Sequence, residues 1–240
     1  MIDLLNSLDS QIYLFFNGMH TPLLDTFMSL FTGRFIWIPL YVTLAAMLVR
    51  TFGVKLGGVY LLGIGMAILL TDQTCATVLR PIFERLRPSH PDNPLSEFAT
   101  LVNGYRGGTY GFPSCHSANS FALATFICCL IRRPRIRAFI LVWALLNSYT
   151  RLYLGVHYPG DLLAGGLIGA FFGYVCYRVT THYNPRKRDE SLAGMGRPVV
   201  TLPELHLTSD ITYRPAITIG DLTISVGVVT MLGIAAASVI

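Results

Sequence analysis

The chain has 240 residues, of which 52% are hydrophobic and only 13% are charged. Soluble domains carry roughly 25% charged residues, so this composition argues against a soluble globular protein and indicates an integral membrane protein. The net charge of +5 comes mostly from arginine, which suits phosphate binding, the fixing of membrane topology, or both. The five cysteines lack paired metal-binding spacing, so we interpret them as small buried side chains.

The first eighteen residues predict a helix that lies on the membrane surface. Leu5, Leu8 and Ile12 fall on one helical face with an aromatic residue one turn further on, whereas Asp9 is among the polar residues. An amphipathic helix of this kind rests in the interfacial region of a bilayer. The N-terminus lacks the basic region and cleavage site of a secretory signal, so we expect the first span to direct insertion.

Apolar stretches then predict six transmembrane helices. The first combines residues 22–31 and 35–49. The second covers 56–79, the third 114–131, the fifth 162–179 and the sixth 222–240, and residues 138–150 start the fourth. The expected fold is therefore all-α: a polytopic membrane helix bundle of about six transmembrane helices with an N-terminal interfacial amphipathic helix. Asp72 and Gln73 interrupt the second span, and we interpret them as structural rather than as an ion path. Residues 198–220 favour neither a helix nor a separate domain.

Basic residues predict the topology, because lysine and arginine in short loops collect on the cytoplasmic side. Arg50 and Lys55, residues 132–137 and residues 178–188 occupy alternate turns, which places all three inside. The loops 80–113 and 151–161 then face outside. These outer loops break the charge rule with five arginines, which an anion-binding site would explain: Arg80, Arg85, Arg87, Arg106 and Arg151.

Arginine favours a phosphoryl group as the ligand, because its rigid fork of donors matches phosphate oxygens. Arg80, Arg87 and Arg151 all lie in the predicted outer loops. Ser114 and Asp161 lie at the starts of the third and fifth predicted spans, where free backbone N–H groups also attract anions. The outer face therefore predicts a phosphate site.

Two histidines lie in the same predicted outer region. His157 precedes Asp161 by four residues, so the carboxylate can hold one ring nitrogen and leave the other free to attack. His116, one turn into the third span, is placed to protonate a leaving alkoxide. We interpret His20 and His90, which lack such partners, as structural. The segment around Tyr105 either touches a substrate head group or is only a loop tip.

Taken together, the polar clusters resemble the three signature motifs of the type 2 phosphatidic acid phosphatase (PAP2) superfamily, written K-x6-RP, PSGH and SR-x5-H-x3-D. The corresponding strings are Arg80-x6-Arg87-Pro88, Pro113-Ser114-Cys115-His116 and Thr150-Arg151-x5-His157-x3-Asp161. Order and spacing are kept. Arg80 replaces lysine and keeps the charge, Thr150 replaces serine and keeps the hydroxyl, and Cys115 replaces glycine and adds a side chain beside the phosphate.

The resemblance implies a metal-independent phosphatase without a cofactor. By this likeness His157 attacks phosphorus to give a phosphohistidine, Asp161 orients it, and His116 protonates the leaving oxygen and then activates water. The substrate phosphate would be held by six residues: Arg80, Arg87, Ser114, Cys115, Thr150 and Arg151. Residues 1–181 would form the catalytic membrane domain, and residues 182–240 a cytoplasmic linker with a C-terminal transmembrane helix.

The expected protein is a bacterial inner-membrane enzyme whose active site faces the periplasm or the outside. Its expected partners are a lipid phosphate and the bilayer, without nucleic acid, and its oligomeric state is open. Undecaprenyl diphosphate is the first choice of substrate, because an outside site suits recycling of that carrier. The alternatives are a lipid A phosphatase, a phosphatidylglycerol phosphate phosphatase, a lipid phosphotransferase and, from another class, a catalytically silent lipid-binding or transport protein.

Overall fold

A computed structural model describes residues 2–182, 198–201, 205–206, 212–213 and 216–239. The described chain is built from helices: α1 (Ile2–Asn17), α2 (Pro22–Phe31), α3 (Ile38–Gln73), α4 (Arg80–Phe83), α5 (Cys115–Leu130), α6 (Pro134–Tyr153), α7 (Pro159–His182) and α9 (Ile219–Ala237). A π-helical turn, Thr74–Leu79, joins α3 to α4, and short 3-10 turns occupy Phe35–Trp37, Pro94–Glu97 and Val102–Gly104. The expected all-α class is confirmed.

The residues that the structure describes between α7 and α9 form four short strands. Strand β1 (Pro198–Thr201) pairs antiparallel with β4 (Ala216–Thr218), and β2 (Leu205–His206) pairs antiparallel with β3 (Thr212–Tyr213). They fall in residues 198–220, for which the sequence favoured neither a helix nor a separate domain. The basic residues 186–188 lie outside the described residues.

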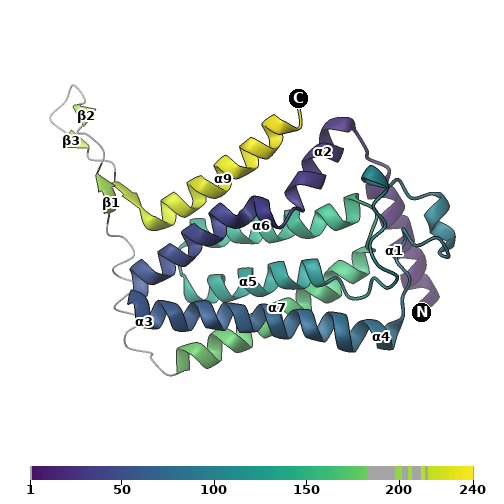
Figure 1. The fold of residues 1–240 in the computed structure, drawn as a ribbon, viewed down its shortest axis with the longest axis horizontal. Coiled ribbons are helices and arrows are strands. Elements are labelled where there is room, and N and C mark those ends of the chain that lie inside the picture. The colour runs from purple at the N-terminus through teal and green to yellow at the C-terminus, as the bar shows by residue number, and fades with distance from the viewer. Residues whose placement is uncertain (1, 183–197, 202–204, 207–211, 214–215, 240) are drawn as a thin grey trace.

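Helix α3 is a hairpin of two antiparallel arms rather than one straight helix. Gly53 adopts φ 78° and ψ 165°, a conformation that costs glycine little because it has no Cβ. The chain reverses there, so that residues 38–52 and 54–73 run in opposite directions (Figure 1). Gly57 lets the arms approach closely, since a Cβ at this position would meet the backbone of Val49. The predicted turn between the first and second spans is therefore present.

Close packing of α5 against α7 builds the centre of the bundle. Gly165, Gly169 and Gly173 repeat every four residues on α7, and a Cβ at any of them would collide with a backbone carbonyl of α5 or its N-cap. Small residues at this spacing let helix backbones approach in membranes, where packing replaces the hydrophobic effect. This contact brings the beginnings of α5 and α7 together, and the Ser114 N–H donates to the Asp161 carbonyl at 3.0 Å.

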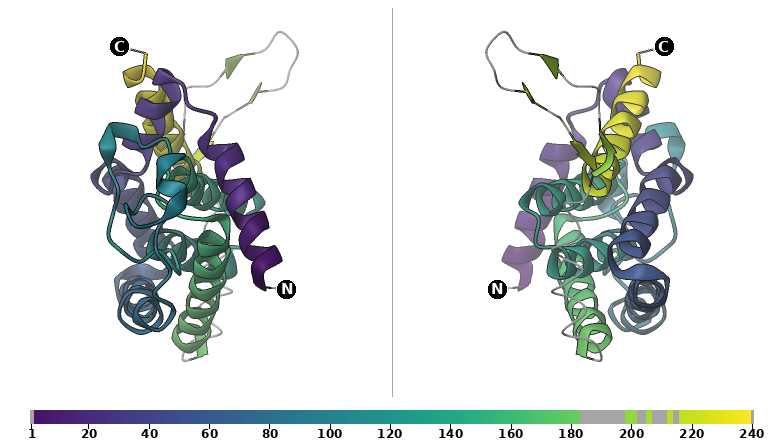
Figure 2. Two further views of the ribbon diagram at one scale, coloured as in Figure 1. Left: turned by 90° about the vertical axis from the view of Figure 1, so that its right-hand side faces the viewer. Right: turned by 90° about the vertical axis from the view of Figure 1, so that its left-hand side faces the viewer.

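Helix α1 lies across one end of the bundle and not along it (Figures 1 and 2). Its Leu5, Leu8 and Ile12 side chains are exposed, as the predicted interfacial helix requires, whereas Tyr13 and Asn17 are buried against the protein. The loop between α4 and α5 covers the same end, seen face-on in the left view of Figure 2. The turn at Gly53 lies at the opposite end.

Three helical stretches in the described part of the chain are long and apolar enough to cross a membrane: Phe35–Phe83, Pro159–His182 and Ile219–Ala237. The first contains both arms of the α3 hairpin. Helix α5 is apolar but shorter, and α6 carries arginines near both ends. The bundle is that of a membrane protein, while the number of six spans and the domain boundary at residue 181 stay predictions.

Candidate active site

His157 lies at the centre of the polar end, in the short connection between α6 and α7. Only 2% of it is exposed, and the Asp161 carboxylate beside it is fully buried. The His157 ring contacts Asp161 Oδ2 through Nδ1 at 3.2 Å and Arg87 Nη1 through Nε2 at 2.9 Å. Helix α7 begins at Pro159, so its first turn sets the spacing between the histidine and the carboxylate.

These two contacts define the tautomer of His157. A guanidinium only donates hydrogen bonds, so Nε2 must accept from Arg87 and cannot carry a proton. The proton therefore sits on Nδ1 and is donated to Asp161. Burial, together with the nearby cation Arg87, lowers the pKa of His157 well below its usual value. The result is a neutral imidazole with a lone pair on Nε2.

The second oxygen of the Asp161 carboxylate, Oδ1, is held by Arg85, which also binds Asp9. Arg85 donates through Nη1 to Asp161 Oδ1 at 2.9 Å and through Nη2 to Asp9 Oδ2 at 2.6 Å. Asp9, from α1, also accepts from the Gly160 N–H at 2.7 Å, and the Arg85 guanidinium lies 4.0 Å over the Tyr158 ring. The interfacial helix is thereby connected to the carboxylate that orients His157.

Three arginines converge around the open side of His157. Within the described chain, the buried Nε atoms of Arg80, Arg87 and Arg151 have no hydrogen-bond partner. Burial, followed by repulsion from Arg80 and Arg151, lowers the pKa of Arg87 to about 10. Unpaired buried donors and mutual repulsion are both costly, and a bound anion would relieve both. The cluster is therefore suited to hold phosphate.

His116 lies across from His157 in the first turn of α5. Its Nε2 lies 2.6 Å from Asn147 Oδ1 and 3.4 Å from Thr32 Oγ1, and the amide oxygen must accept the Nε2 proton. Arg151 donates to the same Thr32 hydroxyl at 3.1 Å. Asn147 and Thr32 thus fix the second histidine next to the arginine cluster.

The predicted site residues divide into two groups. Six of them line one cavity: Arg80, Arg87, Cys115, His116, Arg151 and His157. Three others lie behind it. The Ser114 hydroxyl caps α5 by accepting from the Ser117 N–H, the Thr150 hydroxyl donates to the Asn147 carbonyl at 2.7 Å, and Asp161 supports His157.

The other two outer arginines do not line this cavity. Arg85 binds two carboxylates, and Arg106 donates to the Ser89 carbonyl at 2.6 Å, which joins two parts of the outer loop. Tyr105 lies with its ring 5.7 Å from the Arg151 guanidinium carbon, so this loop reaches the arginine cluster.

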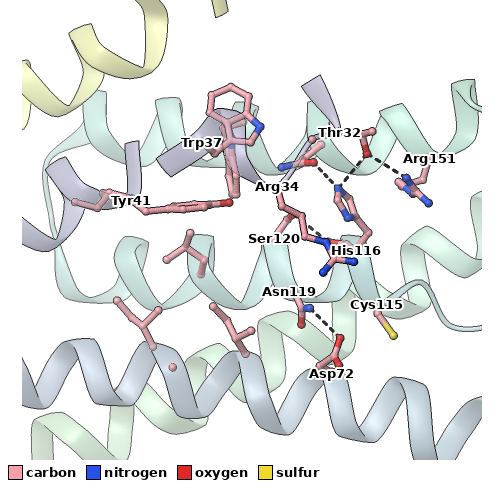
Figure 3. Close-up of a pocket in the computed structure, with 18 of the residues that line it drawn as sticks. Thr32, Arg34, Trp37, Tyr41, Asp72, Cys115, His116, Asn119, Ser120 and Arg151 are labelled. Carbon is pink, nitrogen blue, oxygen red and sulfur yellow. Dashed lines mark hydrogen bonds between the residues drawn. The ribbon is translucent and has the colours of Figure 1, made fainter. Parts of the chain in front are cut away.

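The cavity measures about 740 Å³ and extends from the arginines into the bundle (Figure 3). Thr32 and Arg34 come from the connection between α2 and α3, and Asp72 and Asn119 lie deeper on α3 and α5. Beyond them the lining is apolar and aromatic, and includes Trp37. The shape suits a ligand with a phosphate at one end and an apolar tail at the other.

A helical membrane bundle with a neutral histidine, a buried carboxylate and an arginine cluster defines a membrane phosphate-handling enzyme. The PAP2 superfamily profile matches residues 58–185, more than half of the chain. The chain belongs to the PAP2 superfamily of membrane phosphatases, which confirms the predicted family and the predicted class of phosphate hydrolase.

Individual relatives carry names of lipid phosphatases. The chain is 48% identical over 82% of its length to the lipid A 4'-phosphatase of Bacteroides thetaiotaomicron, of which it covers 88%. It is 31% identical to the lipid A 4'-phosphatase of Porphyromonas gingivalis, over 74% of this chain and 75% of that one. It is 26% identical to the undecaprenyl-diphosphatase of Sulfolobus acidocaldarius, over 70% of this chain and 75% of that one.

The fold is also similar to a solved structure. A crystal structure of a transmembrane PAP2-type phosphatidylglycerolphosphate phosphatase from Bacillus subtilis matches 76% of this chain and 89% of that one, with a TM-score of 0.56 and 24% identity. At this identity the likeness concerns the fold alone.

Several residues of the site were not selected from the sequence. Asp9 and Arg85 act on Asp161 from positions that no motif includes, and Asn147, Thr32 and Arg34 belong to helices or connections without a polar pattern. Of these residues, only Arg85 could have been noticed from the sequence, because it is an arginine in a predicted outer loop, where the charge rule disfavours basic residues. The partners of the others depend on the fold.

Proposed function

We propose that this protein is a lipid A phosphatase that removes the 4'-phosphate through a phosphohistidine intermediate. The observation that carries the chemistry is the Arg87–His157–Asp161 arrangement at the mouth of a cavity with an apolar end. The choice of lipid rests on the relatives, since those with the two highest identities given above both bear the name lipid A 4'-phosphatase. Undecaprenyl diphosphate, the first choice from sequence, becomes the alternative.

The proposed reaction begins when phosphate enters the arginine cluster. Arg87 exchanges its contact with His157 Nε2 for a phosphate oxygen, which frees the Nε2 lone pair. Nε2 then forms a bond to phosphorus while the bond from phosphorus to the sugar oxygen breaks. His116 enters this step protonated on both ring nitrogens, gives one proton to that oxygen and becomes neutral. Arg80, Arg87 and Arg151 stabilise the charge of the equatorial oxygens in the transition state.

Asp161 supports the cationic ring that forms during attack, because the Nδ1 proton stays between the ring and the carboxylate. In the second half of the reaction, His116 takes a proton from water as the water oxygen attacks phosphorus. The bond between phosphorus and Nε2 breaks, phosphate leaves, and His157 returns to its neutral form. The chain's own residues supply every proton transfer, so we propose that no metal is required.

The cellular setting is part of the same proposal. The arginine-rich end faces the periplasm of a bacterial inner membrane, and the basic turns face the cytoplasm. The charge pattern supports this orientation, since four of the five outer arginines that break the charge rule line the cavity or hold Asp161: Arg80, Arg85, Arg87 and Arg151. Residues 1–181 form the catalytic domain, followed by a linker and a final transmembrane helix.

The test is phosphate release from lipid A by purified protein in detergent with a chelator present. Wild type is expected to release phosphate from the 4' position, and His157→Ala is expected to lose at least about a thousandfold in kcat, as removal of a nucleophile does. His90→Ala is the matched control, because His90 lies in the outer loop but does not line the cavity. Equal rates in wild type and His157→Ala would refute the phosphohistidine.

The alternatives give different products in the same assay. A diphosphatase would release phosphate from undecaprenyl diphosphate and not from lipid A, and a phosphatidylglycerol phosphate phosphatase would act only on that phospholipid. A phosphotransferase would move labelled phosphate to a second lipid rather than to water. A catalytically silent lipid-binding or transport protein would release none from any of them.

A further inference from the structure

A polar layer lies in the cavity beyond the arginine cluster and outside the three motifs. It consists of Asp72 on α3, Asn119 on α5 and Arg34 ahead of α3 (Figure 3). Asn119 follows His116 by three residues, so it lies about 4.5 Å deeper along the helix axis. Arg34 lies at the exposed edge of this layer, whereas Asp72 and Asn119 are half-buried, and polar side chains inside a membrane bundle are expensive and indicate function by default.

Asp72 and Asn119 bond to each other and leave acceptors unused. Asn119 Nδ2 donates to Asp72 Oδ1 at 3.1 Å. Among the described residues, this is the one hydrogen bond that the Asp72 side chain makes. Asn119 Oδ1 is buried and has no partner there. A hydrogen bond between two helices explains one oxygen of Asp72. It does not explain the Asn119 oxygen, which is buried without a partner, and it leaves the second Asp72 oxygen free to accept from a ligand.

Arg34 supplies a positive charge to the same layer. Within the described part of the chain it has no ion pair and no side-chain hydrogen bond, although it lines the cavity together with Asp72. The layer therefore offers a donor group on one side and free acceptors on the other. A complementary ligand carries both hydrogen-bond donors and acceptors.

The layer separates two unlike parts of the cavity. On its outer side lie Arg80, Arg87 and Arg151, and on its inner side the lining is apolar, with Leu44, Leu61 and other aliphatic side chains. A ligand whose phosphate contacts the arginines therefore passes its next group through the polar layer and its tail into the apolar part.

We propose that Asp72, Asn119 and Arg34 form a head-group subsite that selects a sugar-like group, rich in hydroxyls or amides, between the phosphate and the lipid tails. Hydroxyl and amide N–H groups donate to Asp72 and Asn119, and sugar oxygens accept from Arg34. A prenyl diphosphate offers only acceptors at this position, so Asp72 repels it. The subsite rests on the proposed function, because it identifies the residues that would read the acylated sugar of lipid A.

Binding to catalytically inactive protein tests the subsite without relying on turnover. Dissociation constants for lipid A and for undecaprenyl diphosphate would be measured on His157→Ala protein in detergent, with and without Asp72→Asn. Asp72→Asn conserves shape and removes the charge. We expect it to weaken lipid A binding about 10–100-fold, the loss expected for a hydrogen bond to a charged group. Binding of the diphosphate is expected to stay unchanged or to tighten, because the repulsion is removed.

Two further variants make the result specific. Asn119→Leu removes the unpaired acceptor and, like Asp72→Asn, is expected to weaken the binding of lipid A. Arg34→Gln is expected to weaken the binding of both ligands. Gln73→Leu is the matched control, since Gln73 follows Asp72 directly in the chain, is exposed and does not line the cavity. Its dissociation constants are expected to match the parent for both ligands.

The proposal is overturned if Asp72→Asn leaves lipid A binding unchanged or weakens both ligands equally. Equal weakening would mean that Asp72 acts only on the packing of α3 against α5. The proposed function fails by a different result, namely that wild-type protein releases no phosphate from lipid A. Because the binding test uses inactive protein, either failure can be observed without the other.

Discussion

The contact between Arg87 and His157 decides which nitrogen of the histidine is available for chemistry. Arg87 donates to Nε2 and Asp161 accepts from Nδ1, so the ring is neutral and its lone pair is directed at the arginine cluster. A phosphate oxygen attracts Arg87 more strongly than a neutral nitrogen does, because the hydrogen bond is then charge-assisted on both sides. Substrate binding thereby exposes the nucleophile.

His157 is expected to remain neutral far below the ordinary histidine range. Its folded-state pKa is lowered by burial and by Arg87, whereas the unfolded chain protonates it near pH 6.5. Below about pH 6.5 the unfolded state therefore binds a proton that the folded state does not. The contribution of His157 to the free energy of unfolding decreases as the pH is lowered below this value. NMR of histidine labelled with 15N should show the neutral Nδ1–H form at pH 5.5, with His157→Ala used for assignment. A titration centred near pH 6.5 would contradict this.

Arg85 is a positioning residue, because it holds Asp161 and does not line the cavity that the arginine cluster lines. Arg85→Gln is expected to lower kcat by about 10–100-fold, the cost of a hydrogen bond to a charged group, with little change in KM. Arg85→Lys, which can bind only one carboxylate at a time, should restore part of the rate. Arg50→Gln at the opposite end is the control. A rise in KM alone would place Arg85 in substrate binding instead.

At the residue scale, the motif spacing predicted which side chains meet, because the partners within each motif lie only a few residues apart in the chain. His157 and Asp161 are four residues apart, and the connection that leads into the first turn of α7 brings them together. Asp9 and Arg85 could not be found in this way. They reach Asp161 from distant parts of the chain, and only the packing of α1 across the bundle end makes them neighbours.

At the scale of elements, the glycines of α7 set the position of Asp161. A Cβ on Gly169 would collide with the Ala118 carbonyl, so Gly169→Ala is expected to separate α7 from α5. The expected loss is about 1–3 kcal/mol of stability, typical of overpacking, with reduced activity because Asp161 begins the same helix. Thermal unfolding in detergent measures the first effect. Gly58→Ala is the control, since a Cβ there meets nothing within 4 Å, and equal unfolding temperatures for the two variants would contradict the argument.

Helix positions were largely predictable from apolar runs, whereas helix ends were not. Residues 114–131 correspond to α5 (Cys115–Leu130) because polar residues bound that run closely. The fourth span was predicted to start at residues 138–150, whereas α6 (Pro134–Tyr153) begins four residues earlier and includes Arg135 and Arg151. Hydrophobicity marks the apolar part of a helix, and a helix continues wherever its polar end groups find partners.

At the scale of the whole molecule, one end carries the site and the other carries basic turns. The arginine cluster, α1 and the outer loop occupy the first end, and the turns at Gly53 and between α5 and α6 occupy the second (Figure 1). The alternating charge pattern predicted this separation, because each pass through a membrane reverses the side. It could not predict the cavity, which exists because side chains of α3, α5, α6 and the segments that connect them leave space between them.

The orientation of the two ends in the membrane gives the last prediction. In a variant whose native cysteines are replaced, Asp92→Cys on the outer loop is expected to react with a membrane-impermeant maleimide in spheroplasts. Arg132→Cys, in the basic turn after α5, is expected to react only after the membrane is permeabilised, because basic turns stay on the cytoplasmic side. Both positions are exposed, so a difference in labelling reports the side of the membrane and not burial. Labelling in the reverse order would place the active site in the cytoplasm, where it would meet lipids before their export.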